Sequence, residues 1–274
     1  MVQLTANLSA GLIELLQSEA VSIEALEVGP WFSVEQIRHY QQMLPGWKFY
    51  FHHSNLISRL KWVAGTAELL QGYLQCTQSP WISTHYSLLP PGHVWLAARF
   101  GWYLPPPDPV KAAQWFTEQV AKLKQLSELP VLLENMPSFP TRKYAFETAA
   151  ESISEILNRT YSMFLLDLAH ARVTASVFNL DVHEYLSNLP LEKVVQIHVS
   201  GPRFKNGHLN DAHEDLQDED YLLLEWVLRH TNPQMVTLEY FKDRQKLYTQ
   251  LIRLQKIIAS ANSAGANSAR EFSE

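Results

Sequence analysis

The chain has 274 residues, of which 46% are hydrophobic, and its formal net charge is -6. This length and apolar content fit one large domain with a single core, which we place at 1–260. Lys and Arg are scattered, so the chain lacks the basic stripe that a phosphate backbone requires, and we expect no nucleic-acid partner.

Apolar, strand-like runs alternate with amphipathic, helix-like segments along the chain. After a short helix at 7–18, the expected strands are 23–30, 48–54, 81–87, 130–136, 163–170, 194–201 and 235–241. The expected helices are 33–44, 57–75, 110–128, 145–159, a short one near 181–189, 218–231 and 242–261. Repeated alternation of this kind indicates a parallel sheet that is covered by helices.

Three segments depart from the alternation. The proline-rich stretch 88–109 is expected as a loop around at most one short helical turn. The polar stretch 203–216 gives only a weak seventh strand. The last residues, 261–274, are small and polar with no apolar face, so we expect a disordered tail.

Seven or eight strand-helix units over about 260 residues favour an α/β fold of the closed (β/α)8 TIM-barrel type, with one irregular βα unit. An open doubly wound sheet would show fewer strands and a glycine-rich first turn, and the sequence contains neither GxGxxG nor a P-loop. Dinucleotide and P-loop enzymes are therefore disfavoured.

The single cysteine, Cys76, cannot form an internal disulfide, and the N-terminus lacks the basic start and apolar run of a secretion signal. No window approaches the roughly eighteen uninterrupted apolar residues that a spanning helix needs. We therefore expect a cytoplasmic protein without membrane insertion.

Nearly every expected strand ends in a residue that can bind a metal ion. These residues are His52 or its neighbour His53, His85, Glu134, Asp167 with His170, His198, Asp211 with His213, and Glu239. The C-terminal ends of barrel strands converge on one mouth, so we expect these side chains to meet there. Each alone is more simply a hydrogen-bonded loop residue or a helix cap.

Together, these imidazoles and carboxylates would be costly to bury without cations as partners. Nine ligands exceed what one four- to six-coordinate ion uses, so the sequence predicts a site for two or three ions. Mixed imidazole and carboxylate sets suit iron, zinc or manganese. A carboxylate has two oxygens to share, which makes Glu134 and Glu239 the expected bridging ligands.

The ordered series of motifs resembles the multinuclear non-heme iron-dependent oxidative enzymes (MNIO), a family of TIM barrels that modify peptides. LEVGPW (26–31) is similar to that family's LEVHPEN element, FYFHH to its strand ending in LHG, STHY to SEHL, and ENMPSF to ENPSSY. LLDLAHARVTA is similar to LLDVNNVYVSA, IHVSG to HLAG, DAH to DTH, and TLEY to IEWD. The likeness runs from about residue 23 to 243 and matches His52 to the family histidine.

The sequence also departs from this family. Gly29 stands where many members carry a histidine, HSNLI replaces a glycine-rich stretch, and His170 replaces an asparagine. The last change brings the sequence closer to the endonuclease IV-like and xylose isomerase-like barrels, whose zinc sites use DxxH and DxH pairs. The acidic net charge argues against a DNA-hydrolysing enzyme.

The resemblance implies a cluster of two or three iron ions, Fe(II) and Fe(III), which uses O2 to modify a residue, expected to be a cysteine, of a ribosomally made peptide. It further implies a partner protein that presents the peptide by binding its leader. Three residues next to the ligands in sequence, Asn135, Arg203 and Lys205, are candidates for orienting substrate. Trp31, Trp81 and Tyr86 lie near strand ends, where they either pack in the core or line a substrate groove.

Two alternatives remain open. In the first, zinc or manganese replaces iron, and the metal activates a water or polarises a sugar carbonyl for a hydrolase or isomerase. In the second, the barrel is catalytically inactive and serves as a binding scaffold.

Overall fold

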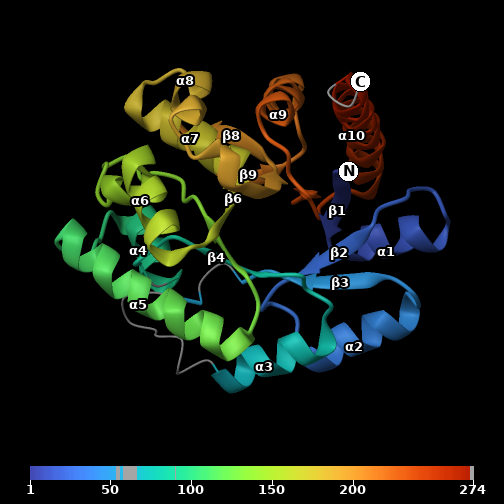
Figure 1. Cartoon of the computed structure of the whole chain (residues 1–274), viewed down its shortest axis with the longest axis horizontal. Coiled ribbons are helices and arrows are strands. Elements are labelled where there is room, and N and C mark those ends of the chain that lie inside the picture. The colour runs from blue at the N-terminus through green and yellow to red at the C-terminus, as the bar shows by residue number, and fades with distance from the viewer. Residues whose placement is uncertain (54–55, 58–66, 90, 272–274) are drawn as a thin grey trace.

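Eight parallel strands form one barrel in a computed structural model that describes residues 1–53, 56–57, 67–89 and 91–271 (Figure 1). The barrel strands are β1 (Gln3–Asn7), β2 (Ala25–Val28), β3 (Lys48–Phe51), β4 (Ile82–His85), β5 (Val131–Glu134), β6 (Met163–Asp167), β7 (Val194–Val199) and β10 (Met235–Leu238). Their order in the sheet is β3-β2-β1-β10-β7-β6-β5-β4.

The seam between β3 and β4 nearly closes the barrel. One parallel bridge joins His52 to Ser83, and the backbone N–H of Leu56 donates to Oγ1 of Thr84 at 3.1 Å. A side-chain hydrogen bond therefore helps to hold β3 to β4, where the strands share fewer backbone hydrogen bonds than the other strand pairs do. The expected barrel class is confirmed.

Helices surround the strands (Figure 1). They are α1 (Ala10–Gln17), α2 (Val34–Met43), α3 (Ala67–Cys76), α4 (Pro91–Phe100), α5 (Pro109–Ser127), α6 (Ala150–Thr160), α7 (Leu168–Phe178), α8 (Val182–Ser187), α9 (Asp218–His230) and α10 (Arg244–Glu271), with 3-10 turns η2 (Ala145–Thr148) and η3 (Leu191–Lys193). Both faces of the sheet are covered, so β5 and β10 are buried along their whole length. No described helix is long and apolar enough to cross a bilayer.

The first barrel strand, β1, was not predicted from the sequence. Its outward side chains, Leu4 and Ala6, are apolar and buried in the core, but its inward ones are polar. Thr5 is only 1% exposed and shares a 2.7 Å hydrogen bond with Thr237 on the neighbouring strand β10. A five-residue run with polar interior positions lacks the continuous apolar pattern that marked the other strands.

The prediction of a seventh barrel strand at 203–216 was wrong. This segment forms an antiparallel hairpin of β8 (Gly201–Lys205) and β9 (His208–Glu214), which lies outside the barrel and packs on α7. Asn206 and Gly207 have φ of 53° and 78°, the left-handed pair that a two-residue hairpin turn needs. The eighth strand of the barrel is β1.

Two helices replace expected loop or strand. The segment 91–100 is a full helix, α4, where a loop with at most one helical turn was expected. The strand expected at 163–170 ends at Asp167, because this carboxylate accepts from the backbone N–H of His170 at 2.7 Å and caps α7. Much of the expected helix 57–75 lies outside the described residues. Helix α10 continues to Glu271, and the division of the chain at residue 260 stays a prediction.

Candidate metal centre

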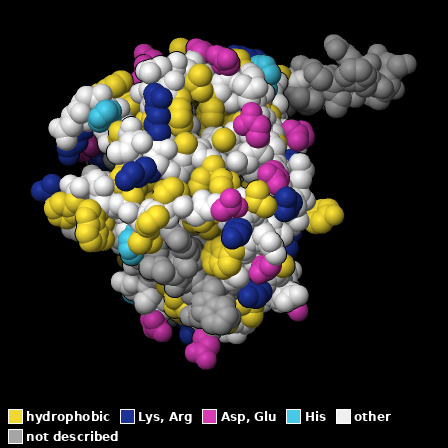
Figure 2. Space-filling view, turned by 90° about the vertical axis from the view of Figure 1, so that its left-hand side faces the viewer, with side chains coloured by type: hydrophobic (Ala, Val, Ile, Leu, Met, Phe, Trp, Pro, Cys, Tyr) yellow, Lys and Arg dark blue, Asp and Glu magenta, His cyan; other side chains and the backbone are white. Residues whose placement is uncertain are grey.

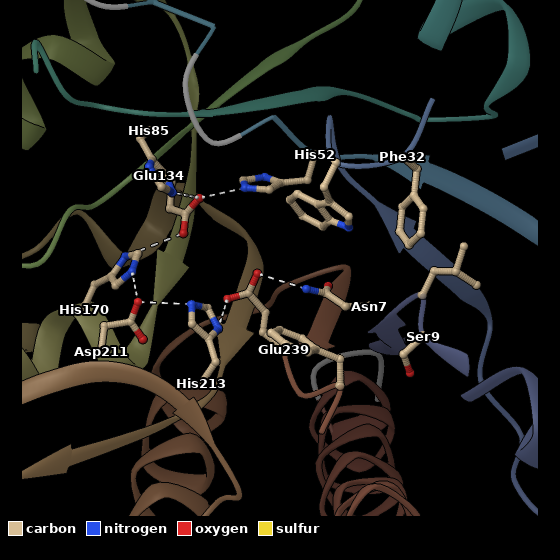
Figure 3. Close-up of a pocket in the computed structure, with 13 residues that line it drawn as sticks. Asn7, Ser9, Phe32, His52, His85, Glu134, His170, Asp211, His213 and Glu239 are labelled. Carbon is tan, nitrogen blue, oxygen red and sulfur yellow. Dashed lines mark hydrogen bonds and ion pairs between the residues drawn. The ribbon is translucent and has the colours of Figure 1, made fainter. Parts of the chain in front are cut away.

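The predicted ligands meet at the C-terminal end of the barrel (Figure 3). His52 follows β3, His85 ends β4, Glu134 ends β5, Asp167 ends β6, His170 lies in the first turn of α7, His198 is on β7, Asp211 and His213 are on β9, and Glu239 follows β10. Strand register brings several of them side by side, since His85 pairs with Glu134 and Asp167 pairs with His198. We refer to these nine residues as the ligand cluster.

Glu134 lies at the centre of the ligand cluster. Its Oε2 is 3.1 Å from Nε2 of His85 and 3.5 Å from Nε2 of His52. Its Oε1 is 3.6 Å from Nδ1 of His170 and 3.7 Å from Nδ1 of His198. Each oxygen therefore faces two imidazoles, which is the arrangement expected of a carboxylate that bridges two ions.

Asp211 and Glu239 extend the cluster outward. Oδ2 of Asp211 lies 3.3 Å from Nε2 of His170 and 3.2 Å from Nε2 of His213. Glu239 places Oε1 3.4 Å from Nδ1 of His198 and Oε2 3.6 Å from Nδ1 of His213. The cluster is thus one continuous set of contacts across the mouth.

Two of the histidines are oriented by hydrogen bonds outside the cluster. Nδ1 of His52 lies 2.8 Å from the Ser83 hydroxyl, and Nδ1 of His170 lies 2.7 Å from the Asn135 carbonyl. A carbonyl only accepts, so Nδ1 of His170 carries the proton and Nε2 is left for a metal.

The sequence reasoning missed Glu27, which orients His198 from below. Oε2 of Glu27 lies 3.2 Å from Nε2 of His198 and accepts from the Gln196 amide at 2.8 Å. Burial raises the pKa of Glu27, but the charges of His198 and His52 outweigh that effect and lower it. The available signal was an acidic residue within the buried strand Ala25–Val28, because a buried carboxylate needs a partner.

The electrostatics of the cluster fit bound cations. Several buried ligand atoms have no hydrogen-bond partner among the described residues, including Glu134 Oε2, Asp167 Oδ2 and His198 Nδ1. Burial raises the pKa of Asp167 and of Glu239. Neighbouring histidines lower it and neighbouring carboxylates raise it, and the pKa of both groups stays above its ordinary value. Three groups have ligand atoms within 4.8 Å of one another, namely His52–His85–Glu134, Glu27–His198–Glu239 and Glu134–Asp167–His198. Divalent ions would satisfy these atoms and offset the repulsion.

The three candidates for orienting substrate lie outside the cavity. Asn135 is fully buried, and its side-chain amide both donates to and accepts from the backbone of Asp167, at 3.0 and 2.8 Å. Arg203 donates to the carbonyls of Pro202 and Asp215 at the base of the hairpin. Lys205 ends β8 and is exposed.

Of the remaining candidates from the sequence, His52 and Trp31 line the cavity, whereas His53, Trp81 and Tyr86 do not. His52, not its neighbour, contacts Glu134, while the ring of His53 packs edge-on against Phe51. Trp31 lines the cavity. Trp81 is buried in an apolar cluster inside the barrel and donates to Gln196, and Tyr86 packs edge-on against Phe116.

A cavity of about 670 Å³ opens above the ligand cluster. Seven members of the ligand cluster line it, and the rest of the lining is largely apolar (Figure 3). The lining residues are Asn7, Leu8, Ser9, Trp31, Phe32, His52, His85, Glu134, His170, Asp211, His213, Glu239 and Phe241. None of these described lining residues is a lysine or arginine.

Fold and site together define a TIM barrel with a cluster of histidines and carboxylates at the mouth that could hold metal ions. The chain belongs to the family described as RiPP precursor modification enzyme MbnB/TglH/ChrH, whose model matches residues 56–262. The resemblance to the MNIO family is thereby confirmed.

Curated relatives match over shorter stretches. A UPF0276 protein of Caulobacter vibrioides is 31% identical over 139 residues, which is 50% of this chain and 49% of the relative. UPF0276 protein VP3015 of Vibrio parahaemolyticus is 32% identical over 98 residues, covering 36% of this chain and 34% of the relative. The chain therefore matches about half or less of the length of these relatives.

Solved structures share the fold at low sequence identity. A D-tagatose 3-epimerase-like protein superposes with a TM-score of 0.62 at 15% identity, covering 96% of this chain and 99% of that one. A xylose isomerase-like TIM barrel protein from Mycobacterium smegmatis, in complex with magnesium, gives 0.59 at 13% identity over 95% and 98%. These likenesses support the barrel and carry no assignment of activity.

Proposed function

We propose that this protein is a multinuclear non-heme iron-dependent oxidase that uses O2 to modify a residue, expected to be a cysteine, of a ribosomally made peptide. Family membership supports peptide modification. The observation that carries a multinuclear site is Glu134, whose Oε2 faces Nε2 of His85 and of His52 at 3.1 and 3.5 Å and whose Oε1 faces Nδ1 of His198 at 3.7 Å. A single four- to six-coordinate ion would leave at least three of the nine residues of the ligand cluster unused.

In this proposal the nine residues of the ligand cluster hold two or three iron ions. Glu134 and Glu239 would be the ligands shared between ions, because each has imidazoles near both of its carboxylate oxygens. When bound, iron supplies the redox chemistry with O2 that zinc does not. Asn135 acts as a positioning residue, since its amide fixes the backbone that carries Asp167.

The proposed partners are a peptide substrate and a protein that presents it by binding its leader. Nucleic acid is not expected, because the described cavity lining has no basic side chain. On the face shown in Figure 2, Lys and Arg side chains are interspersed with Asp and Glu and form no basic stripe. A peptide enters such a cavity without needing a cationic track.

Metal analysis of protein purified without air tests the proposal. Elemental analysis and iron-sensitive spectroscopy are expected to find about two or more irons per chain. His198→Ala should lose metal and turnover, whereas His208→Ala, a substitution of an exposed histidine on the same hairpin as Asp211, should keep both. Zinc alone together with phosphoesterase activity would contradict the oxidase assignment.

A second candidate is a zinc- or manganese-dependent hydrolase or sugar isomerase. The structural neighbours named as epimerase-like and isomerase-like favour it, because they place such chemistry on a similar barrel. It predicts activity that is independent of O2 and retained with zinc or manganese. A third candidate, an inactive scaffold, predicts incomplete metal occupancy and tolerance of His198→Ala.

A further inference from the structure

The part of the cavity lining that lies outside the ligand cluster is largely aromatic, and we refer to it as the aromatic wall. Trp31, Phe32 and Phe241 line it together with Leu8. Trp31 and Phe241 are each 54% exposed, although large apolar side chains in this protein are mostly buried. Exposed aromatic surface that lines a cavity beside ligand-type residues is typical of a binding site.

Gly29 makes room for the indole of Trp31. A Cβ built at Gly29 would come within 3.0 Å of three carbon atoms of the Trp31 ring, closer than real side chains approach. The backbone φ of Gly29 is not in the left-handed region, so the glycine serves the ring and not the backbone. In this chain the indole occupies the space beside residue 29 that a side chain at that position would need.

The other rings are held in place next to the ligand cluster. The Tyr73 hydroxyl donates to the carbonyl of Phe32 at 2.8 Å, and the Phe32 ring packs edge-on against Tyr40 at 5.6 Å. The rings of Trp31 and Phe32 are 6.2 Å apart. On the other side, the Phe241 ring lies 6.4 Å from the ring of His213, a member of the cluster.

Asn7 supplies a polar group between the aromatic wall and the ligand cluster. Its side chain contacts Oε1 of Glu239 at 3.5 Å, and because an ionised carboxylate only accepts, the amide nitrogen must face Glu239. Figure 3 shows this side chain directed at Glu239. Oδ1 of Asn7 is buried and has no hydrogen-bond partner among the described residues, so it lacks a donor. A peptide N–H is a donor of the required kind.

We propose that the aromatic wall binds an aromatic side chain of the substrate peptide, next to the residue that is modified at the metal cluster. The identification of the substrate as a peptide rests on the proposed function. Outside the ligand cluster, Asn7 and Ser9 are the only polar residues of the described lining, too few to bind the hydroxyls of a sugar. A cavity of about 670 Å³ holds a few residues of a peptide.

A double-mutant cycle tests this specificity. The probes are two acetylated pentapeptides that differ only in whether Trp or Ala flanks a single Cys. Binding is measured by calorimetry without air on metal-loaded wild type, Trp31→Ala, Gly29→Ala and the double variant. Wild type should bind the Trp peptide about tenfold more tightly than the Ala peptide. Both single variants should lose most of this ratio.

The cycle distinguishes an effect on the position of the Trp31 ring from a general loss of structure. Gly29→Ala should have no further effect once Trp31 is Ala, because its only role here is to admit the ring. Trp102→Ala is the matched control, since Trp102 is 75% exposed and does not line the cavity, and it should keep the full ratio.

Three results would overturn the proposal: no preference in wild type, a preference that survives Trp31→Ala, or loss of metal in Trp31→Ala. The test remains separate from the proposed function. A protein that holds zinc and oxidises nothing, yet shows the preference and the cycle, would refute the oxidase and retain the aromatic site.

Discussion

The inner and outer parts of the ligand cluster are built differently. Inner ligands such as Glu134, Asp167 and His198 stand on barrel strands and are at most 1% exposed. The outer pair, Asp211 and His213, stands on the hairpin β8–β9, and these side chains are 19% and 34% exposed. The inner ligands are placed by strand register, whereas the outer pair is placed by the docking of a hairpin on α7.

The backbone shows the same contrast. His213 has a φ of 44°, a left-handed conformation that is uncommon for residues other than glycine and that is often found at functional sites. The hairpin is held from outside by Lys242, whose Nζ donates to the carbonyl of Ala212 at 3.0 Å. We infer that the barrel forms the inner site whether or not metal is bound, while the outer site depends on the hairpin.

The largest expected effect is that of Glu134→Gln. The substitution removes the negative charge that faces four imidazoles, so metal affinity should fall more than about 100-fold, beyond the 10- to 100-fold typical of groups behind the ligands. Elemental analysis after dialysis measures the loss. The control is Glu147→Gln, because burial raises the pKa of Glu147 to about 8 and this carboxyl is already neutral near pH 7. Equal metal content in both variants would refute the central role of Glu134.

Glu27→Gln should weaken the inner site less. The amide keeps the shape of the carboxylate but loses the charge that orients His198, so metal affinity should fall about 10- to 100-fold. Competition with a chelator gives the affinity. An unchanged affinity would mean that strand register alone places His198.

His213→Ala should separate the outer site from the inner one. We expect the metal content to fall by about one ion per chain while the remaining ions stay bound, because the inner ligands do not depend on the hairpin. His198→Ala should instead lose all of the metal. If both variants lose the same amount, the division into inner and outer sites is wrong.

The smallest effect concerns pH and the metal-free protein. Burial lowers the pKa of His213, but the hydrogen bond to Asp211 and the charge of Glu239 outweigh that effect and raise this pKa from 6.5 to about 9. A histidine whose pKa is higher in the folded than in the unfolded protein stabilises the fold. This stabilisation is fully present below the unfolded pKa of 6.5 and is lost as pH rises through about 9. Between pH 6.5 and 9.5, the Tm of wild type should therefore fall roughly 2–4 °C more than that of His213→Gln. Thermal scans of metal-free protein measure this difference. If His213 were not paired with Asp211, the Tm of the wild type and of the variant would change with pH in the same way.

Much of the site could be predicted from the sequence, because it depends on which residue ends each strand. His85, Glu134 and His198 are recognisable from apolar runs that stop at a ligand-type residue. In a parallel barrel the C-terminal ends of all strands lie at one rim, so this local pattern predicts that residues far apart in the sequence lie close together. The same reasoning failed for β1, whose inward Thr5 and Asn7 interrupt the apolar pattern.

Apart from β1 and the hairpin β8–β9, the strands and the ligand-type residues near their C-terminal ends were predicted from the sequence alone. Only the tertiary structure decided that Glu27 backs His198, that His52 and not His53 faces Glu134, and that Trp31 packs over Gly29. These facts depend on register, on the side of the strand to which each residue points, and on how the hairpin docks. Such relations arise from packing between segments far apart in the chain, and no local sequence pattern contains them.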